Sequence, residues 1–316
     1  MLTTVARPGV AFGALLRVVA AAFCWGLNAV FAKAAFDRGV PPARLAEARV
    51  AVALLALAPL LAWRRPDLLR VPRGVLPVLA AFGACVAAVN FTYYLAIDHL
   101  PVGVAISLQY TGPVLLLGFT AVVARRPPGA MAWAAGALTL AGAVLVSRAL
   151  EGLTGIDATG LVAGLASAVL FAAYLLLAEL SGRRGVTPGA VLLWGFVAAV
   201  AVWSVAAPWW SWPYGRLADW HVALAVLGVG LVGTLLPFFL AVDAVRHIPA
   251  ATAGIAATSE PVFAAALAWL LLGQRLTAAQ LAGGALVVAG VVLAQAATAR
   301  RNAAADESRP DHPQYG

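Results

Sequence analysis

Long apolar runs dominate this sequence and constrain its fold more than any other feature. A helix needs roughly 17–25 mostly apolar residues to cross the ~30 Å hydrocarbon core of a bilayer, and we find ten such runs in the 316 residues. They cover residues 13–35, 45–63, 75–97, 102–123, 129–147, 159–180, 188–207, 222–241, 250–272 and 278–297. With 63% hydrophobic and only 11% charged residues, the chain cannot cover its outside with polar groups. We therefore predict an all-α membrane protein with ten transmembrane helices.

The distribution of basic residues predicts the orientation of these helices. If the N-terminus is cytoplasmic, thirteen basic residues of the loops and tail lie inside and five lie outside. The other three, Arg17, Lys33 and Arg49, lie within or at the ends of predicted helices. The first apolar run is too long for a signal peptide, so we expect it to be retained as a helix. Both termini are therefore predicted to be cytoplasmic, in a multi-pass protein of the inner membrane.

The two halves of the chain repeat each other. The segment YLAIDHLPVGVA from Tyr94 aligns without gaps with VDAVRHIPAATA from Val242, an offset of 148 residues that also pairs Pro113 with Pro261. Each half holds five spans, an odd number, so the second half must enter the membrane from the opposite side. The charges of equivalent loops change in agreement with this inversion. The predicted units are two inverted five-helix repeats, 1–148 and 149–299, and a disordered cytoplasmic tail, 300–316.

Inverted repeats are typical of secondary transporters, in which two halves move about a central site. Channels and structural membrane proteins can also contain them, so the repeat favours transport without establishing it.

Three segments carry a resemblance to a known family. They are WGLNAVFAK from Trp25, NFTYYLAIDHLPVGVAISLQYTGPV from Asn90, and LLPFFLAVDAVRHIPAATAGIAATSEPVFAAALAWLLLGQRLTAAQLAGGALVVAGVVLA from Leu235. Together they resemble EamA-type proteins of the drug/metabolite transporter superfamily, and the second resembles bacterial amino-acid exporters of that group, including the threonine/homoserine type. The resemblance covers all ten spans. One departure is Gln274, which stands where the family usually has Glu before Arg275, and we expect it to alter pairing within that loop.

This resemblance implies a transporter that works by alternating access and exports amino acids or other small polar metabolites. It also implies that the fifth and tenth helices pack at the periphery while the others line the cavity. Glycines on those two helices suit close helix packing, and they are Gly136, Gly142, Gly284 and Gly290.

Prolines at equivalent positions of the two halves predict where the central site lies. Pro113 and Pro261 have no N–H group and displace the carbonyls of Gln109 and Ala257, which kinks both helices. Glu260 lies ten residues into its helix, roughly 15 Å along the axis and near the bilayer midplane. A carboxyl group there binds a substrate ammonium, carries a coupling proton, or forms a structural hydrogen bond, and we favour the functional roles.

A set of polar and aromatic residues surrounds this position in the predicted bundle. We predict substrate contacts from Trp25, Asn28, Gln109, Tyr110 and Glu260. Further candidates for lining the cavity are Lys33, Arg49, Asn90, Tyr94, Tyr174 and Trp194.

The basic candidates and the aromatic loop residues have simpler explanations as well. Lys33 and Arg49 flank the outer loop between the first two helices, where they could attract a carboxylate or a phosphate. We favour the alternative that both extend their charged ends to the membrane interface. We interpret the aromatic residues of one predicted outer loop as an aromatic belt at the membrane interface. They are Trp209, Trp210, Trp212 and Tyr214.

Other classes of function find little support in the sequence. The loops carry no nucleophile–base pair, phosphate-binding glycine loop or metal-ligand cluster, and Cys24 and Cys85 lie in apolar runs. We therefore expect no enzyme activity, cofactor or metal, and no nucleic-acid binding. The expected partners are a small-molecule substrate, the lipid bilayer and protons, for a monomer or homodimer. A multidrug efflux pump and a flippase for lipid-linked substrates of the same superfamily stay open as alternatives.

Overall fold

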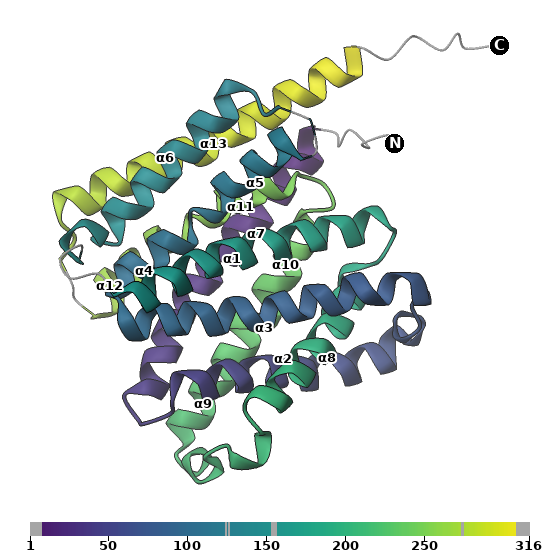
Figure 1. Cartoon of the computed structure of the whole chain (residues 1–316), viewed down its shortest axis with the longest axis vertical. Helices are drawn as coiled ribbons and strands as arrows, with labels where there is room; N and C mark the ends of the chain where they lie inside the picture. Colours follow the sequence, from purple (N-terminus) through teal and green to yellow (C-terminus); the bar gives the residue numbers. More distant parts are fainter. Residues whose placement is uncertain (1–7, 124, 126, 153–156, 273–274, 308–316) are drawn as a thin grey trace.

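The structure, a computed structural model, describes residues 8–123, 125, 127–152, 157–272 and 275–307. Within these residues it contains helices and connections and no strand (Figure 1). The helices are α1 (Pro8–Phe36), α2 (Pro42–Arg64), α3 (Leu76–His99), α4 (Val102–Gln109), α5 (Gly112–Val122), α6 (Ala130–Val146), α7 (Ala158–Arg183), α8 (Pro188–Ala206), α9 (Trp220–Gly230), α10 (Leu236–Ala244), α11 (Ala250–Ala257), α12 (Glu260–Leu272) and α13 (Ala278–Glu307). Short 3₁₀ turns are η1 (Pro66–Leu69), η2 (Arg73–Val75), η3 (Ala149–Gly152), η4 (Trp209–Ser211) and η5 (Tyr214–Ala218), and η6 (Leu231–Leu235) is a π-helical turn.

Most of the predicted spans correspond to helices that are long and apolar enough to cross a membrane. In the described part of the chain nine segments qualify, counting the interrupted helices as single spans. The predicted span at 129–147 corresponds to α6, which is apolar but has 17 residues. The structure thus confirms an all-helical membrane protein, and the total of ten spans stays a prediction.

Two spans are divided into shorter helices at equivalent positions. The first is α4 followed by α5, and the second is α11 followed by α12 (Figure 1). Each second helix carries its proline, Pro113 or Pro261, one residue after its start. Both helices of the second pair begin 148 residues after those of the first, at Ala250 and Glu260.

Hydroxyl side chains satisfy the backbone at both interruptions. The Thr111 hydroxyl donates to the Leu108 carbonyl at 2.7 Å, and the Ser259 hydroxyl donates to the Ala256 carbonyl at 2.7 Å. Thr111 and Ser259 lie 148 residues apart along the chain, and so do the acceptors Leu108 and Ala256. Both carbonyls also accept the backbone N–H of the same residue at 3.1 Å, so each interruption closes on itself, as hydrocarbon without hydrogen-bond partners requires.

Glycines allow α6 and α13 to lie side by side at one edge of the molecule (Figure 1). A Cβ atom on Gly142 would lie 2.6 Å from the Gly283 carbonyl oxygen, and one on Gly290 would lie 2.5 Å from Thr139 Cγ2. Similarly, a Cβ atom on Gly160 of α7 would lie 2.6 Å from Leu100 Cγ. These glycines therefore serve helix packing within the chain.

The C-terminal tail differs in part from the prediction. Helix α13 continues to Glu307, so residues 300–307 are helical although the tail was predicted to be disordered from residue 300. Alanines at 303–305 favour this continuation because alanine has the highest helix propensity. Residues 308–316 and Gln274 lie outside the described residues.

The contact between α3 and α8 gives a test of this packing. A Cβ atom on Gly83 would lie 2.1 Å from the Gly195 carbonyl oxygen, whereas a Cβ atom on Gly118 of α5 would meet no atom within 4 Å. We expect Gly83→Ala to destabilise the protein by about 1–3 kcal/mol, because the two backbones must separate. Gly118→Ala, the matched control, should leave stability unchanged or slightly raised. Thermal unfolding in detergent measures both, and equal stabilities for the two variants would contradict the close approach of α3 and α8.

Candidate functional site

A hydrogen bond joins the two interrupted spans. Tyr110 follows the last residue of α4, is 2% exposed, and donates its hydroxyl to Glu260 Oε2 at 2.5 Å. Glu260 is the first residue of α12 and is partly exposed. The interruptions thus place the side chains of these two predicted site residues in direct contact.

A row of aromatic side chains extends from this pair. Edge-to-face contacts join Tyr110 to Phe171 at 5.8 Å between ring centroids and Phe171 to Tyr174 at 5.3 Å. Tyr174 then contacts Phe238 at 5.4 Å, and Phe238 contacts Trp25 at 5.9 Å. The predicted site residues Trp25, Tyr110 and Tyr174 therefore share one aromatic wall, which the two phenylalanines complete.

Arg49 lies in the interior of the bundle, and its prediction needs correction. We favoured extension of this side chain to the membrane interface, but Arg49 is only 5% exposed. Its guanidinium donates from Nε to Thr234 Oγ1 at 2.8 Å, from Nη1 to Asn90 Oδ1 at 2.5 Å and from Nη2 to the Gly233 carbonyl at 2.7 Å. These acceptors hold the charged group inside the protein, where three hydrogen bonds replace its hydration.

The π-helical turn η6 contains two of these acceptors, the Gly233 carbonyl and the Thr234 hydroxyl. Pro237 lacks an N–H group, so the carbonyl four residues earlier, that of Gly233, has no helical donor and accepts from Arg49 instead. The Thr234 hydroxyl donates a hydrogen bond to the Val229 carbonyl at 2.8 Å, and its oxygen accepts one from Arg49 Nε. Sequence reasoning missed Gly233 and Thr234, although Pro237 marks the freed carbonyl by the same rule that was applied to Pro113 and Pro261.

Asn28 on α1 lies between the two polar centres. Its side-chain oxygen is buried and has no hydrogen-bond partner in the described residues. A Cβ atom on Gly233 would lie 2.0 Å from that oxygen, so Asn28 abuts the η6 turn. Two residues earlier, a Cβ atom on Gly26 would lie 3.3 Å from the Glu260 carbonyl oxygen. One short segment of α1 therefore contacts both the Arg49 acceptors and the start of α12.

The remaining predicted residues are spread more widely. Lys33 is exposed and pairs with Asp37 at 3.1 Å, as expected for a side chain at the interface. Tyr94 is buried and stacks against Phe36 and Tyr93, one turn of α3 beyond Asn90. Gln109 ends α4 and is partly buried.

Trp194 lines a different space from the one predicted. It borders a cavity of about 210 Å³ between α3 and α8, together with Leu79 and Val197, and its indole N–H is buried without a partner in the described residues. A second cavity, of about 280 Å³ between α2 and α8, is bordered by Glu47 and Trp203 among others. Neither cavity is bordered by Arg49 or Glu260.

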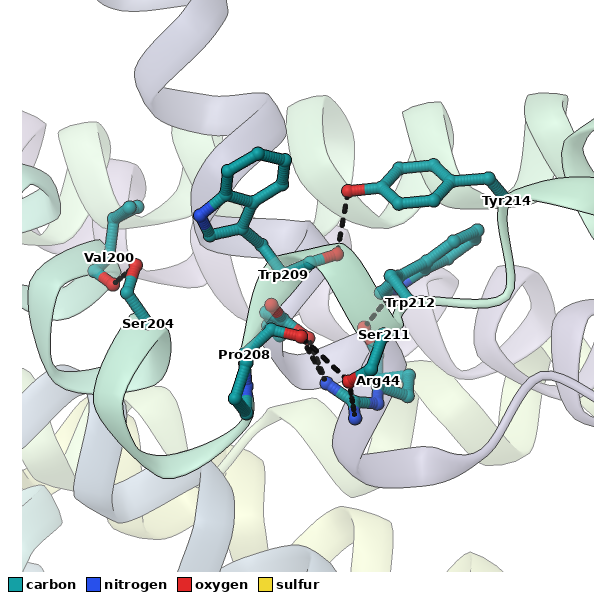
Figure 2. A network of polar contacts seen from close by, with 9 residues as sticks. Arg44, Val200, Ser204, Pro208, Trp209, Ser211, Trp212 and Tyr214 are labelled. Carbon is teal, nitrogen blue, oxygen red and sulfur yellow. Dashed lines mark hydrogen bonds and ion pairs between the residues drawn. The ribbon is translucent and has the colours of Figure 1, made fainter.

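The tryptophan-rich connection after α8 is tied to α2 by Arg44 (Figure 2). Arg44 donates to Ser211 Oγ at 2.7 Å and to Glu47 Oε2 at 3.0 Å, and its carbonyl accepts from Trp212 Nε1 at 3.0 Å. Trp212 is 7% exposed, so it holds the connection in place and does not belong to an aromatic belt. Trp209, which is 58% exposed, suits the belt that the sequence predicts.

Comparison with known proteins places this arrangement among transporters. The sequence profile of the EamA-like transporter family matches residues 12–148 and again residues 158–295. The chain is 30% identical over 240 residues to the threonine/homoserine exporter RhtA of Escherichia coli (strain K12), covering 73% of this chain and 76% of that protein. It is 23% identical over 295 residues to the uncharacterized transporter YwfM of Bacillus subtilis (strain 168), covering 92% of this chain and 96% of that one. A solved structure, titled only as the crystal structure of a protein, matches the fold with a TM-score of 0.75 at 22% identity, covering 91% of this chain and 98% of that chain.

The buried contacts of Arg49 can be tested through protein stability. Thr234→Val keeps the side-chain shape but leaves the Nε proton of a buried guanidinium without an acceptor, which should cost about 1–3 kcal/mol. Thr92→Val on α3 is the matched control, since the Thr92 hydroxyl bonds only carbonyls of its own helix. The measurement is thermal unfolding of the purified variants in detergent. A Thr234 variant as stable as the Thr92 variant would contradict the role of Thr234 as an acceptor for Arg49.

Proposed function

Because this chain belongs to the EamA-like transporter family, we propose that it is a secondary transporter that exports amino acids or similarly small polar metabolites by alternating access. The chain is a multi-pass protein of the inner membrane, with helices of the length and hydropathy that spanning requires. The name of its relative RhtA, a threonine/homoserine exporter, supports amino acids as the first substrates to test.

The observation that carries the proposal is the contact between Tyr110 and Glu260. An ionisable side chain at the middle of a membrane span is costly and typically belongs to a substrate or proton pathway. Here the carboxyl group belongs to a partly exposed residue at the interruption between α11 and α12 and uses one oxygen to accept from Tyr110. In the proposed mechanism Glu260 binds the substrate ammonium or a proton in turn, so that export of one accompanies entry of the other.

The proposed architecture has ten spans in two inverted repeats, residues 1–148 and 149–299, with both termini cytoplasmic. Three observations support it. The family profile matches the chain twice, the interruptions lie 148 residues apart, and basic residues favour the loops on one side. In this arrangement α6 and α13 are the peripheral helices, and the interrupted spans move about the central site.

The two alternative functions are a drug efflux pump and a flippase for lipid-linked substrates, and different observations bear on each. The aromatic row from Trp25 to Tyr110 would also suit the flat rings of organic cations in a drug efflux pump. A flippase for lipid-linked substrates would need a laterally open cavity with a basic headgroup site. The two cavities described above are bordered by apolar residues together with Ser204 and Glu47, and no basic residue is among these borders. These borders favour the export of small metabolites over the flippase.

Proteoliposomes loaded with radiolabelled threonine test the function directly. We expect saturable efflux that an inward proton gradient accelerates. In Glu260→Gln this efflux should fall by about 100-fold or more, because the amide can neither carry the proton nor balance an ammonium charge. The control is Glu47→Gln, which neutralises another membrane carboxyl group, one that pairs with Arg44. This variant should retain efflux.

The outcomes separate the alternatives. Undiminished efflux by folded Glu260→Gln would remove Glu260 from the mechanism. If the wild type moves no amino acid, the amino-acid proposal fails, and the same vesicles then serve for tests with organic cations and lipid-linked sugars.

A further inference from the structure

Arg49 retains hydrogen-bonding capacity that the protein does not use. A guanidinium has five N–H donors, and the described contacts of Arg49 use one on each of its three nitrogens. One N–H group therefore remains on Nη1 and one on Nη2. An arginine uses two N–H donors to bind both oxygens of a carboxylate, and two remain here.

Arg49 also forms no direct ion pair within the described residues. Its three hydrogen-bond partners in the described part of the chain, Thr234, Asn90 and the Gly233 carbonyl, are all neutral. By contrast, Arg44 on the same helix pairs directly with Glu47. Arg49 stands seven residues after the first residue of α2, roughly 10 Å along the helix axis. A buried cation at that depth without an anion is costly, and such residues typically mark the path of a charged substrate.

Asn28 connects Arg49 with Glu260 in space. Asn28 abuts Gly233, whose carbonyl accepts from Arg49, while Gly26 on the same turn of α1 packs against the backbone of Glu260. The buried side-chain oxygen of Asn28 has no donor among the described residues. Residues 26–28 of α1 thus contact both the turn that binds Arg49 and the backbone at the start of α12.

We propose that Arg49 is the carboxylate-binding residue of the transporter and forms, with Asn28 and Glu260, a site for zwitterionic α-amino acids. The substrate carboxylate takes the two free N–H groups of Arg49, and the substrate ammonium faces Glu260 and the Asn28 oxygen. The hydrogen bonds that Arg49 donates to Thr234, Asn90 and the Gly233 carbonyl orient the guanidinium while leaving its charge for the substrate. This assignment rests on the proposed export of amino acids and extends it to the recognition of both charged ends.

A purely structural role for Arg49 predicts a different result. If Arg49 only ties α2 to α3 and the η6 turn, its loss weakens transport of every substrate alike. If it binds the carboxylate, its loss removes the preference for substrates that have one. Threonine and threoninamide separate the two roles, because they share the ammonium and side chain and differ only in the carboxylate.

The experiment measures transport of both compounds in proteoliposomes with the wild type, Arg49→Gln, Arg49→Lys and Arg44→Gln. The wild type should prefer threonine by about tenfold or more, since a site built for a charged group rejects an analogue that lacks it. Arg49→Gln should transport the two compounds about equally. Arg49→Lys should keep the preference with a threonine KM raised about tenfold, because lysine keeps the charge but not the paired donors. Arg44→Gln, which removes the other arginine of this part of α2, should retain the wild-type preference.

Each failure has a distinct meaning. A threonine preference that survives in Arg49→Gln overturns the assignment of Arg49 and leaves the proposed function intact. Should Arg49→Gln not fold, Arg49→Lys decides, since a wild-type KM in that variant excludes paired binding of the carboxylate. If the wild type transports neither compound, the proposed function fails and the assignment fails with it.

Discussion

A lipid bilayer offers no hydrogen-bond partners, and the polar contacts of this structure depend on that constraint. Every interruption of a span frees backbone carbonyls that the protein must satisfy from within. At the two equivalent interruptions, the Thr111 and Ser259 hydroxyls donate to the carbonyls three residues earlier, alongside the backbone N–H of the same residue. At the η6 turn a charged side chain takes this role, since Arg49 donates to the carbonyl that Pro237 leaves free. The need to satisfy the Gly233 carbonyl therefore helps to fix the position of the Arg49 guanidinium.

Arg49 and Glu260 are stabilised by neutral hydrogen-bond partners and form no ion pair with each other in the described structure. Glu260 accepts from Tyr110, and Arg49 donates to three neutral acceptors. A direct pair would neutralise both groups, and a substrate would have to break it before binding. Neutral hydrogen bonds lower the cost of burial while the electrostatic field of each charge continues to act on its surroundings. This arrangement is suited to a ligand with two opposite charges.

The sequence predicted the helical membrane fold well because hydropathy acts over whole spans. It named Tyr110 and Glu260 as separate candidates near the two equivalent prolines and did not predict the hydrogen bond between them. Arg49 was misplaced because the length of its side chain allows it to reach either the interface or the interior, and pattern alone does not decide between them. The π-helical turn that accepts it depends on tertiary packing as well as on Pro237. Trp212 was misassigned for a similar reason, since its contact with Arg44 joins segments 168 residues apart.

The backbone of the two halves is more alike than their chemistry. At the offset of 148 residues Glu260 corresponds to Gly112 and Tyr110 to Thr258, while in the earlier helices, at an offset of 146, Arg49 corresponds to Gly195. Equivalent interruptions give both halves the same break in a span, as the proposed alternating access requires. Of the two groups in the proposed site, the cation Arg49 lies in the first half and the carboxyl group of Glu260 in the second. In the proposed mechanism a symmetric backbone therefore moves in two equivalent ways, while an asymmetric pair of charges holds the substrate in a single orientation.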